Sequence, residues 1–98
     1  METIIENIKK EARSILERND TDFAAVFGSH AKGEADKDSD VDILIRFAQP
    51  KSLFEIARIE EELSDSLGRN VDLVTENSLS PYIKDEIISS SKIVYGER

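Results

Sequence analysis

Residues 28–45 read GSHAKGEADKDSDVDILI, and this stretch decides how the whole sequence is interpreted. A polar segment with two glycines runs into an apolar segment in which Asp40 and Asp42 flank Val41. Side chains i and i+2 of a β-strand point to the same face, so the two carboxylates point together while Val41 points into the core. Their backbones are roughly 6–7 Å apart, from a rise of about 3.3 Å per residue. Two like charges at the start of a strand therefore need an explanation.

A divalent cation is one explanation for this acid pair. Without a cation, each carboxylate raises the pKa of the other, which costs stability. Mg²⁺ prefers one or two carboxylates and completes its shell with water and phosphate oxygens. An isolated D-x-D is more often an ordinary solvated strand end, because so short a motif carries a high false-positive risk. The residues next to the pair are therefore needed to distinguish a cation site from a solvated strand end.

The residues before the pair favour a phosphate ligand. Gly28 and Ser29 directly follow the apolar run FAAVF, and a glycine there lets the backbone come close to a ligand. A helical turn over residues 29–33 directs N–H groups toward an anion, while Lys32 adds positive charge and Gly33 allows the exit turn. Gly-Ser alone is compatible with an ordinary turn. Next to an acid pair, it indicates phosphoryl or nucleotidyl transfer.

Asp72 is the candidate third acid. It lies within the apolar run VDLV, where a buried and unpaired charge is costly. If its strand neighbours the strand of Asp42, Asp72 stands beside Asp42, ligates the metal and helps accept the proton of an attacking hydroxyl. An exposed aspartate on an edge strand is the alternative.

The remaining sequence predicts alternating helices and strands. Apolar residues at helical spacing and short β-branched runs give the following expected ranges: helix 2–18, strand 23–27, strand 41–47, helix 52–67, strand 70–75, a short helix after Pro81, and an edge strand or extended tail at 92–95. Ser52 and Glu55 have capping-box spacing, Gly68 suits the position after a helix, and Ser80 precedes a proline suited to a first helical turn. We therefore expect a single domain over 1–98 of the α/β (α+β) class, with a small β-sheet, helices on one face and the other face partly open.

The composition narrows the possible functions. The 98 residues carry 21 acids, 13 bases and a net charge of -8, which disfavours a direct nucleic-acid partner because affinity for phosphates comes from Lys and Arg. There is no cysteine, so disulfides and thiolate metal sites are absent. No apolar run approaches the ~20 residues of a membrane span, and the N-terminus does not have the pattern of a signal peptide. A cytoplasmic protein is the default expectation.

The compound motif resembles that of the DNA polymerase β-like nucleotidyltransferase superfamily, and within it the chain is similar to the minimal nucleotidyltransferases, stand-alone catalytic domains of prokaryotes. The resemblance covers nearly the whole chain. Its residues are Gly28, Ser29, Ala31, Lys32, Gly33, Ser39, Asp40, Asp42 and Asp72.

The resemblance implies a fold, a chemistry and a partner. The fold is a small mixed sheet, and the reaction transfers AMP from ATP to a hydroxyl with two Mg²⁺ ions. Minimal members commonly pair with HEPN-domain toxins and act as antitoxins by adding AMP to a tyrosine of the toxin. The implied partner here is therefore a HEPN toxin in a hetero-oligomer, with no membrane contact.

The resemblance also assigns roles to residues. Gly28 and Ser29 would bind the β- and γ-phosphates, and the nucleotide site includes Lys32 and Ser39. Asp40 and Asp42 would hold both metals, and Asp72 would complete the catalytic metal site.

Two positions in the motif need separate comment. Lys32 replaces the usual arginine, which keeps the charge but loses the planar two-pronged grip on phosphate. His30 occupies a variable position, and as a lone loop histidine it is expected to face solvent.

Two alternatives remain open. The domain could be a non-catalytic antitoxin that neutralises its toxin by binding, since its acidic surface suits a basic partner. It could also transfer AMP to a cationic small molecule, although relatives that do so carry a second domain for the acceptor.

Overall fold

A computed structural model describes residues 3–36 and 38–97. The elements in chain order are α1 (Ile4–Arg18), β1 (Thr21–Phe27), α2 (Ser29–Lys32), β2 (Val41–Phe47), α3 (Leu53–Leu67), β3 (Val71–Thr75), the 3₁₀ turn η1 (Glu76–Ser78), α4 (Pro81–Ser90) and β4 (Lys92–Gly96). The predicted elements are all present, and β1 begins two residues earlier than expected. Residue 2, predicted as the start of the first helix, lies outside the described residues.

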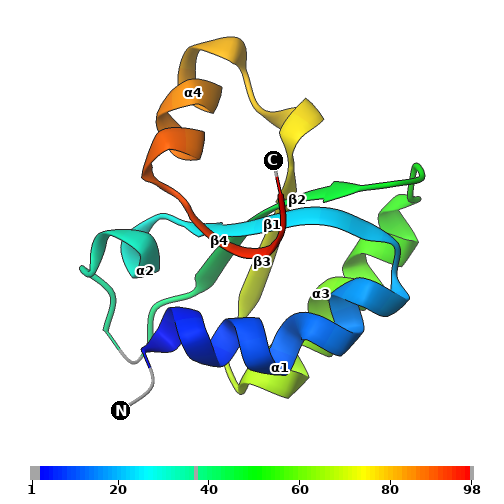
Figure 1. Ribbon diagram of the computed structural model, residues 1–98, viewed down its shortest axis with the longest axis horizontal. Helices are drawn as coiled ribbons and strands as arrows, with labels where there is room; N and C mark the ends of the chain where they lie inside the picture. The colour runs from blue at the N-terminus through cyan, green and yellow to red at the C-terminus, as the bar shows by residue number, and fades with distance from the viewer. Residues whose placement is uncertain (1–2, 37, 98) are drawn as a thin grey trace.

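The four strands form one mixed sheet in the order β3-β2-β1-β4 (Figure 1). β1 is antiparallel to both β2 and β4, whereas β3 runs parallel to β2. A parallel pair needs a crossover connection, and α3 supplies it between β2 and β3. The mixed sheet is confirmed, and the C-terminal segment is an edge strand rather than an extended tail.

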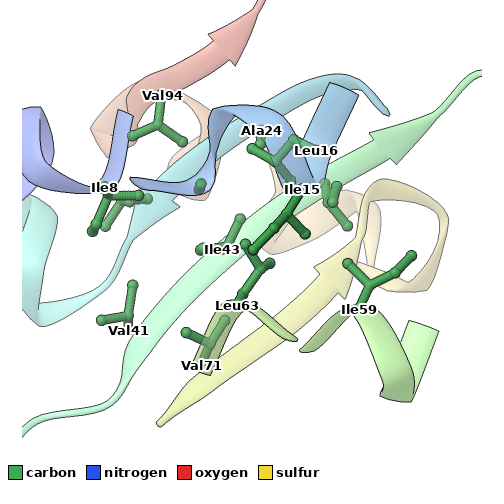
Figure 2. Close-up of a cluster of buried hydrophobic side chains, with 13 residues drawn as sticks. Ile8, Ile15, Leu16, Ala24, Val41, Ile43, Ile59, Leu63, Val71 and Val94 are labelled. Carbon is green, nitrogen blue, oxygen red and sulfur yellow. The ribbon is translucent and has the colours of Figure 1, made fainter. Parts of the chain in front are cut away.

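One face of the sheet packs against α1 and α3 and forms the main core (Figures 1 and 2). Strand β2 contributes Val41, Ile43 and Ile45 to this core, because alternate side chains of a strand share a face. Figure 2 shows Ile8 and Leu16 from α1 and Leu63 from α3 gathered over these strands. Consequently Asp42, one residue out of phase, belongs to the opposite face.

The opposite face carries a smaller cluster, in which α4 takes part. Phe23, Ala25 and Leu44 are buried there, with partly buried hydrophobic residues packed against them, including Ile87 and Ile88 of α4. The expectation of helices on one face is therefore confirmed for α1 and α3, whereas α4 lies against the other face (Figure 1). No residue of α4 is fully buried. This face is thus only partly covered, as expected, and it is the face to which Asp42 belongs.

The predicted ends of α3 are confirmed. Ser52 Oγ accepts a hydrogen bond from Glu55 N at 3.1 Å, and Glu55 Oε1 accepts one from Ser52 N at 3.3 Å. Gly68 closes the helix in the left-handed conformation, with φ 66°. These two caps fix where the crossover helix begins and where it ends before β3. Across residues 3–36 and 38–97, no helix is long and apolar enough to cross a membrane.

Candidate active site

The two strand aspartates stand side by side. Asp42 is the second residue of β2, Asp72 is the second residue of β3, and the two are Cα partners in the parallel register. The sequence placed Asp72 beside Asp42 on the condition that the two strands are neighbours, and the structure meets this condition. Asp72 is also an exposed residue of an edge strand, so its role as a metal ligand stays a prediction. Asp40 lies two residues before Asp42, just outside β2. Asp42 is half-buried, whereas Asp40 and Asp72 are exposed.

The electrostatics of the group centre on Asp42. Burial raises the pKa of Asp42 above its ordinary value, and the negative charges of Asp72 and then Asp40 raise it further. His30 acts in the opposite direction and lowers the pKa of Asp42. Asp42 is thus a partly desolvated carboxylate beside two like charges. The raised pKa is the effect that the sequence predicted for an acid pair without a cation, and it costs stability.

Gly28 lies directly against the Asp42 carboxylate. β1 ends at Phe27, whose Cα partner on β2 is Asp42, so the next residue passes over that side chain. A Cβ added to Gly28 would be 2.6 Å from Asp42 Oδ2. The backbone of Gly28 has φ 73° and ψ -148°, a region that only glycine adopts readily. Both the contact and the conformation require glycine here.

The predicted helical turn follows Gly28 at once. Lys32 N donates to Gly28 O at 3.2 Å, and Glu34 N donates to Ser29 O at 2.9 Å. Lys32, at the end of the turn, is exposed. The turn therefore brings a flexible cation and the backbone of Ser29 to the same end of the sheet as the acids. Their roles in phosphate binding stay predictions.

His30 does not face solvent, and the expectation that it does is wrong. Its side chain is only 8% exposed, and its Nε2 lies 3.2 Å from Ser39 O, the carbonyl oxygen that precedes Asp40. Because a carbonyl can only accept, Nε2 carries the proton in this contact. The ring therefore joins the turn after Gly28 to the loop that leads into Asp40. Nothing in the sequence around His30 signals this contact, which spans nine residues.

Ser39 has its hydrogen bonds within the loop. Its Oγ accepts from Asp36 N at 3.0 Å and donates to Asp36 Oδ1 at 3.2 Å. The same Asp36 Oδ1 accepts from Asp38 N at 2.9 Å. These bonds shape the approach to Asp40, and a contact between Ser39 and a nucleotide stays a prediction.

The aspartates suit a metal ion that also binds a phosphate-bearing substrate. Among residues 3–36 and 38–97, no three His, Cys, Asp or Glu side chains are grouped closely enough to hold a metal ion by themselves. Carboxylate oxygens are nevertheless the donors that Mg²⁺ prefers, and this ion commonly takes only one or two carboxylates and completes its shell with water and phosphate oxygens. A cation at Asp42 and Asp72 would also neutralise the repulsion that raises the pKa of Asp42. The residues therefore fit Mg²⁺ bound together with a phosphate-bearing substrate.

One hollow of the described part of the chain lies away from the three aspartates. It has a volume of about 640 Å³ and is lined by residues at the far ends of β2 and β3, among them Phe47, Lys51, Leu53 and Thr75. None of the three aspartates borders it. The three aspartates lie instead at the sheet face that α4 covers only in part, where a substrate can approach from solvent.

A glycine turn beside acids on adjacent strands of a mixed sheet is the arrangement of a nucleotidyltransferase. Residues 3–98 match the family model described as Polymerase beta, Nucleotidyltransferase, and the chain belongs to this family. The nucleotidyltransferase activity and the polymerase β-like fold expected from the sequence are thereby confirmed.

Two curated relatives show the level of similarity. A protein of Methanocaldococcus jannaschii named as a candidate protein adenylyltransferase is 39% identical over 87 residues, which cover 89% of this chain and 94% of the relative. Protein adenylyltransferase MntA of Thermococcus cleftensis is 41% identical over 95 residues, which cover 97% of this chain and 91% of the relative.

Two solved structures show the same fold. A chain of a toxin–antitoxin complex with AMP-PNP superposes with a TM-score of 0.79 at 23% identity, covering 92% of this chain and 74% of that one. A chain of the tri-AMPylated HEPN toxin of Shewanella oneidensis in complex with its MNT antitoxin gives a TM-score of 0.73 at 20% identity, covering 95% and 73%.

Proposed function

We propose that this chain transfers AMP from ATP to a tyrosine hydroxyl of a HEPN-domain toxin and thereby acts as the antitoxin. The observation that carries the proposal is the in-register pair Asp42 and Asp72, with Gly28 against the Asp42 carboxylate. The relatives named as protein adenylyltransferases support a protein acceptor and AMP as the transferred group.

The chemistry assigns separate tasks to the turn and to the acids. Gly28 and Ser29 bind the β- and γ-phosphates through the backbone, and Lys32 adds a positive charge, with Ser39 completing the nucleotide site. Asp40 and Asp42 hold two Mg²⁺ ions, and Asp72 completes the site of the catalytic ion. When bound, Mg²⁺ neutralises the charge that develops on the phosphate oxygens.

The transfer step itself is a displacement at the α-phosphorus of ATP. The tyrosine oxygen forms a bond to that phosphorus, the bond to the bridging oxygen of the β-phosphate breaks, and pyrophosphate leaves. The proton of the tyrosine hydroxyl passes to Asp72, whose exposed carboxylate is open to an acceptor approaching from solvent.

Charge supports a protein as the acceptor. The net charge of -8 repels a nucleic acid and suits a basic surface on the toxin. The proposed working complex is a hetero-oligomer of this chain with its toxin in the cytoplasm.

The test uses purified toxin, Mg²⁺ and ATP labelled at the α-phosphate. Label should enter the toxin with the wild-type chain and should be lost with Asp42→Asn. Asp65→Asn is the matched control, because it makes the same chemical change at an exposed position on α3. No transfer by the wild-type chain, or equal transfer by Asp42→Asn, contradicts the proposal. Full protection of cells by Asp42→Asn would instead indicate that the chain neutralises its toxin by binding alone.

A further inference from the structure

Strand β3, which carries Asp72, is held from its outer side by two side chains of α3. β3 is an edge strand, so the N–H groups that point away from β2 have no neighbouring strand. Val71 N donates to Ser64 Oγ at 3.0 Å, and Leu73 N donates to Glu60 Oε2 at 2.8 Å. The two residues on either side of Asp72 are therefore both bonded to α3.

The two α3 side chains act as one unit. Glu60 and Ser64 are four residues apart, so they lie one above the other on the same face of the helix. Ser64 Oγ also donates to Glu60 O at 2.8 Å, which directs the oxygen lone pairs toward Val71 N. Both side chains are partly buried. We call Glu60 and Ser64 the α3 pair.

The alternation of a strand makes this arrangement specific for Asp72. Backbone groups of a parallel strand point alternately to one neighbour and the other, so the N–H groups of Val71 and Leu73 point outward. Asp72 itself is the Cα partner of Asp42 within the β2–β3 ladder. The residue that carries the third acid is thus fixed to β2, while both of its chain neighbours are fixed to α3.

We propose that Glu60 and Ser64 are positioning residues that hold the Asp72 carboxylate beside Asp42 for the transfer reaction. The inference rests on the proposed function for its effect on turnover. Without the α3 pair, the edge strand is held on one side only, and edge segments with few buried contacts open locally. A small displacement of a reacting group lowers the rate steeply, so the loss falls on turnover.

Four variants of α3 test this role. Glu60→Ala removes the acceptor for Leu73 N, whereas Glu60→Gln keeps an oxygen that accepts the same hydrogen bond. Glu61→Ala is the matched control, because Glu61 is the next residue, carries the same charge and is exposed. Ser64→Ala removes the acceptor for Val71 N and so tests that contact separately. It replaces Glu60→Ala as the test variant if Glu60→Ala fails to fold.

Three measurements on each variant are compared. Amide exchange of Leu73 and Val71 reports the edge contacts, and the shift of the Asp72 carboxyl carbon on adding Mg²⁺ with a non-hydrolysable ATP analogue reports the position of the acid. In Glu60→Ala we expect exchange of Leu73 faster by on the order of tenfold, and a weakened Mg²⁺ response of Asp72. We also expect a kcat about 10- to 100-fold lower with little change in KM for ATP. Glu60→Gln and Glu61→Ala should remain near wild type in all three.

The inference is overturned if Glu60→Ala speeds the exchange of Leu73 yet leaves the Asp72 response and kcat at wild-type values, because Glu60 would then only protect the strand edge. Unchanged exchange in Glu60→Ala also overturns it, since the contact would then be absent in solution. If the wild-type chain transfers no AMP, the proposed function fails separately, and the Mg²⁺ response of Asp72 still decides whether the α3 pair positions it.

Discussion

Replacing Gly28 by alanine should inactivate the enzyme out of proportion to the stability that it loses. The added Cβ would lie 2.6 Å from Asp42 Oδ2. Carbon–oxygen contacts are usually no closer than about 3.3 Å, so the carboxylate oxygen has to move by roughly 0.7 Å. Because misplacement by about 1 Å costs around 100-fold in rate, we expect kcat to fall by about 10- to 100-fold.

The loss of stability expected for Gly28→Ala determines which control variant is suitable. The conformation of Gly28 costs a residue with a side chain about 1–3 kcal/mol. For a domain of this size, each kcal/mol lowers Tm by roughly 4–8 °C. Gly68→Ala is the matched control, because Gly68 also has a positive φ of 66° but no atom within 4 Å of an added Cβ. It should lose about 1–2 kcal/mol from the left-handed conformation and keep its activity.

The assay is initial-rate AMP transfer at a temperature where all three proteins are folded, beside thermal unfolding of each. The expected result is a similar loss of Tm in Gly28→Ala and Gly68→Ala, with turnover reduced only in Gly28→Ala. Equal turnover in the two variants would refute the reasoning, because it would mean that the Asp42 carboxylate does not need the space next to Gly28.

Two further predictions concern charge and contact at the same site. Asp42→Asn should unfold at a higher temperature than wild type near pH 7, because the raised pKa of Asp42 means that its charge destabilises the folded state. This advantage should shrink as pH falls through the raised pKa and vanish below the ordinary value of 3.8, so a constant difference in Tm from pH 7 to pH 3 would contradict it. His30→Leu should lower AMP transfer by about tenfold by freeing the carbonyl of Ser39 from the turn. His30→Gln, which keeps a donor, should recover most of the rate; equal loss in both variants would show that the ring matters for its packing instead.

The sequence predicts best what depends on neighbouring residues. The start and end of α3 follow from the capping box at Ser52 and from Gly68, and both are observed. The pairing of Asp42 with Asp72 also follows, because period-two alternation leaves little freedom once β2 and β3 are adjacent.

Features that depend on contacts between residues far apart in the sequence could not be predicted in this way. The isoleucines of α4 predict a helix but not which face of the sheet it covers, and that choice is made by packing against residues such as Leu44. His30 is buried, and its ring contacts Ser39, nine residues away. Glu60 is the first of three consecutive acids on α3, which reads as a solvated helix surface, yet it bonds to Leu73 thirteen residues later.

The most direct test of the central claim is intact-mass spectrometry of the toxin co-purified with this chain, as wild type and as Asp42→Asn. The account predicts a toxin heavier by ~329 Da for each AMP with the wild-type chain, and an unmodified toxin in an intact complex with Asp42→Asn. A toxin that co-purifies unmodified with both chains would contradict AMP transfer by these acids and leave binding alone as the means of neutralisation.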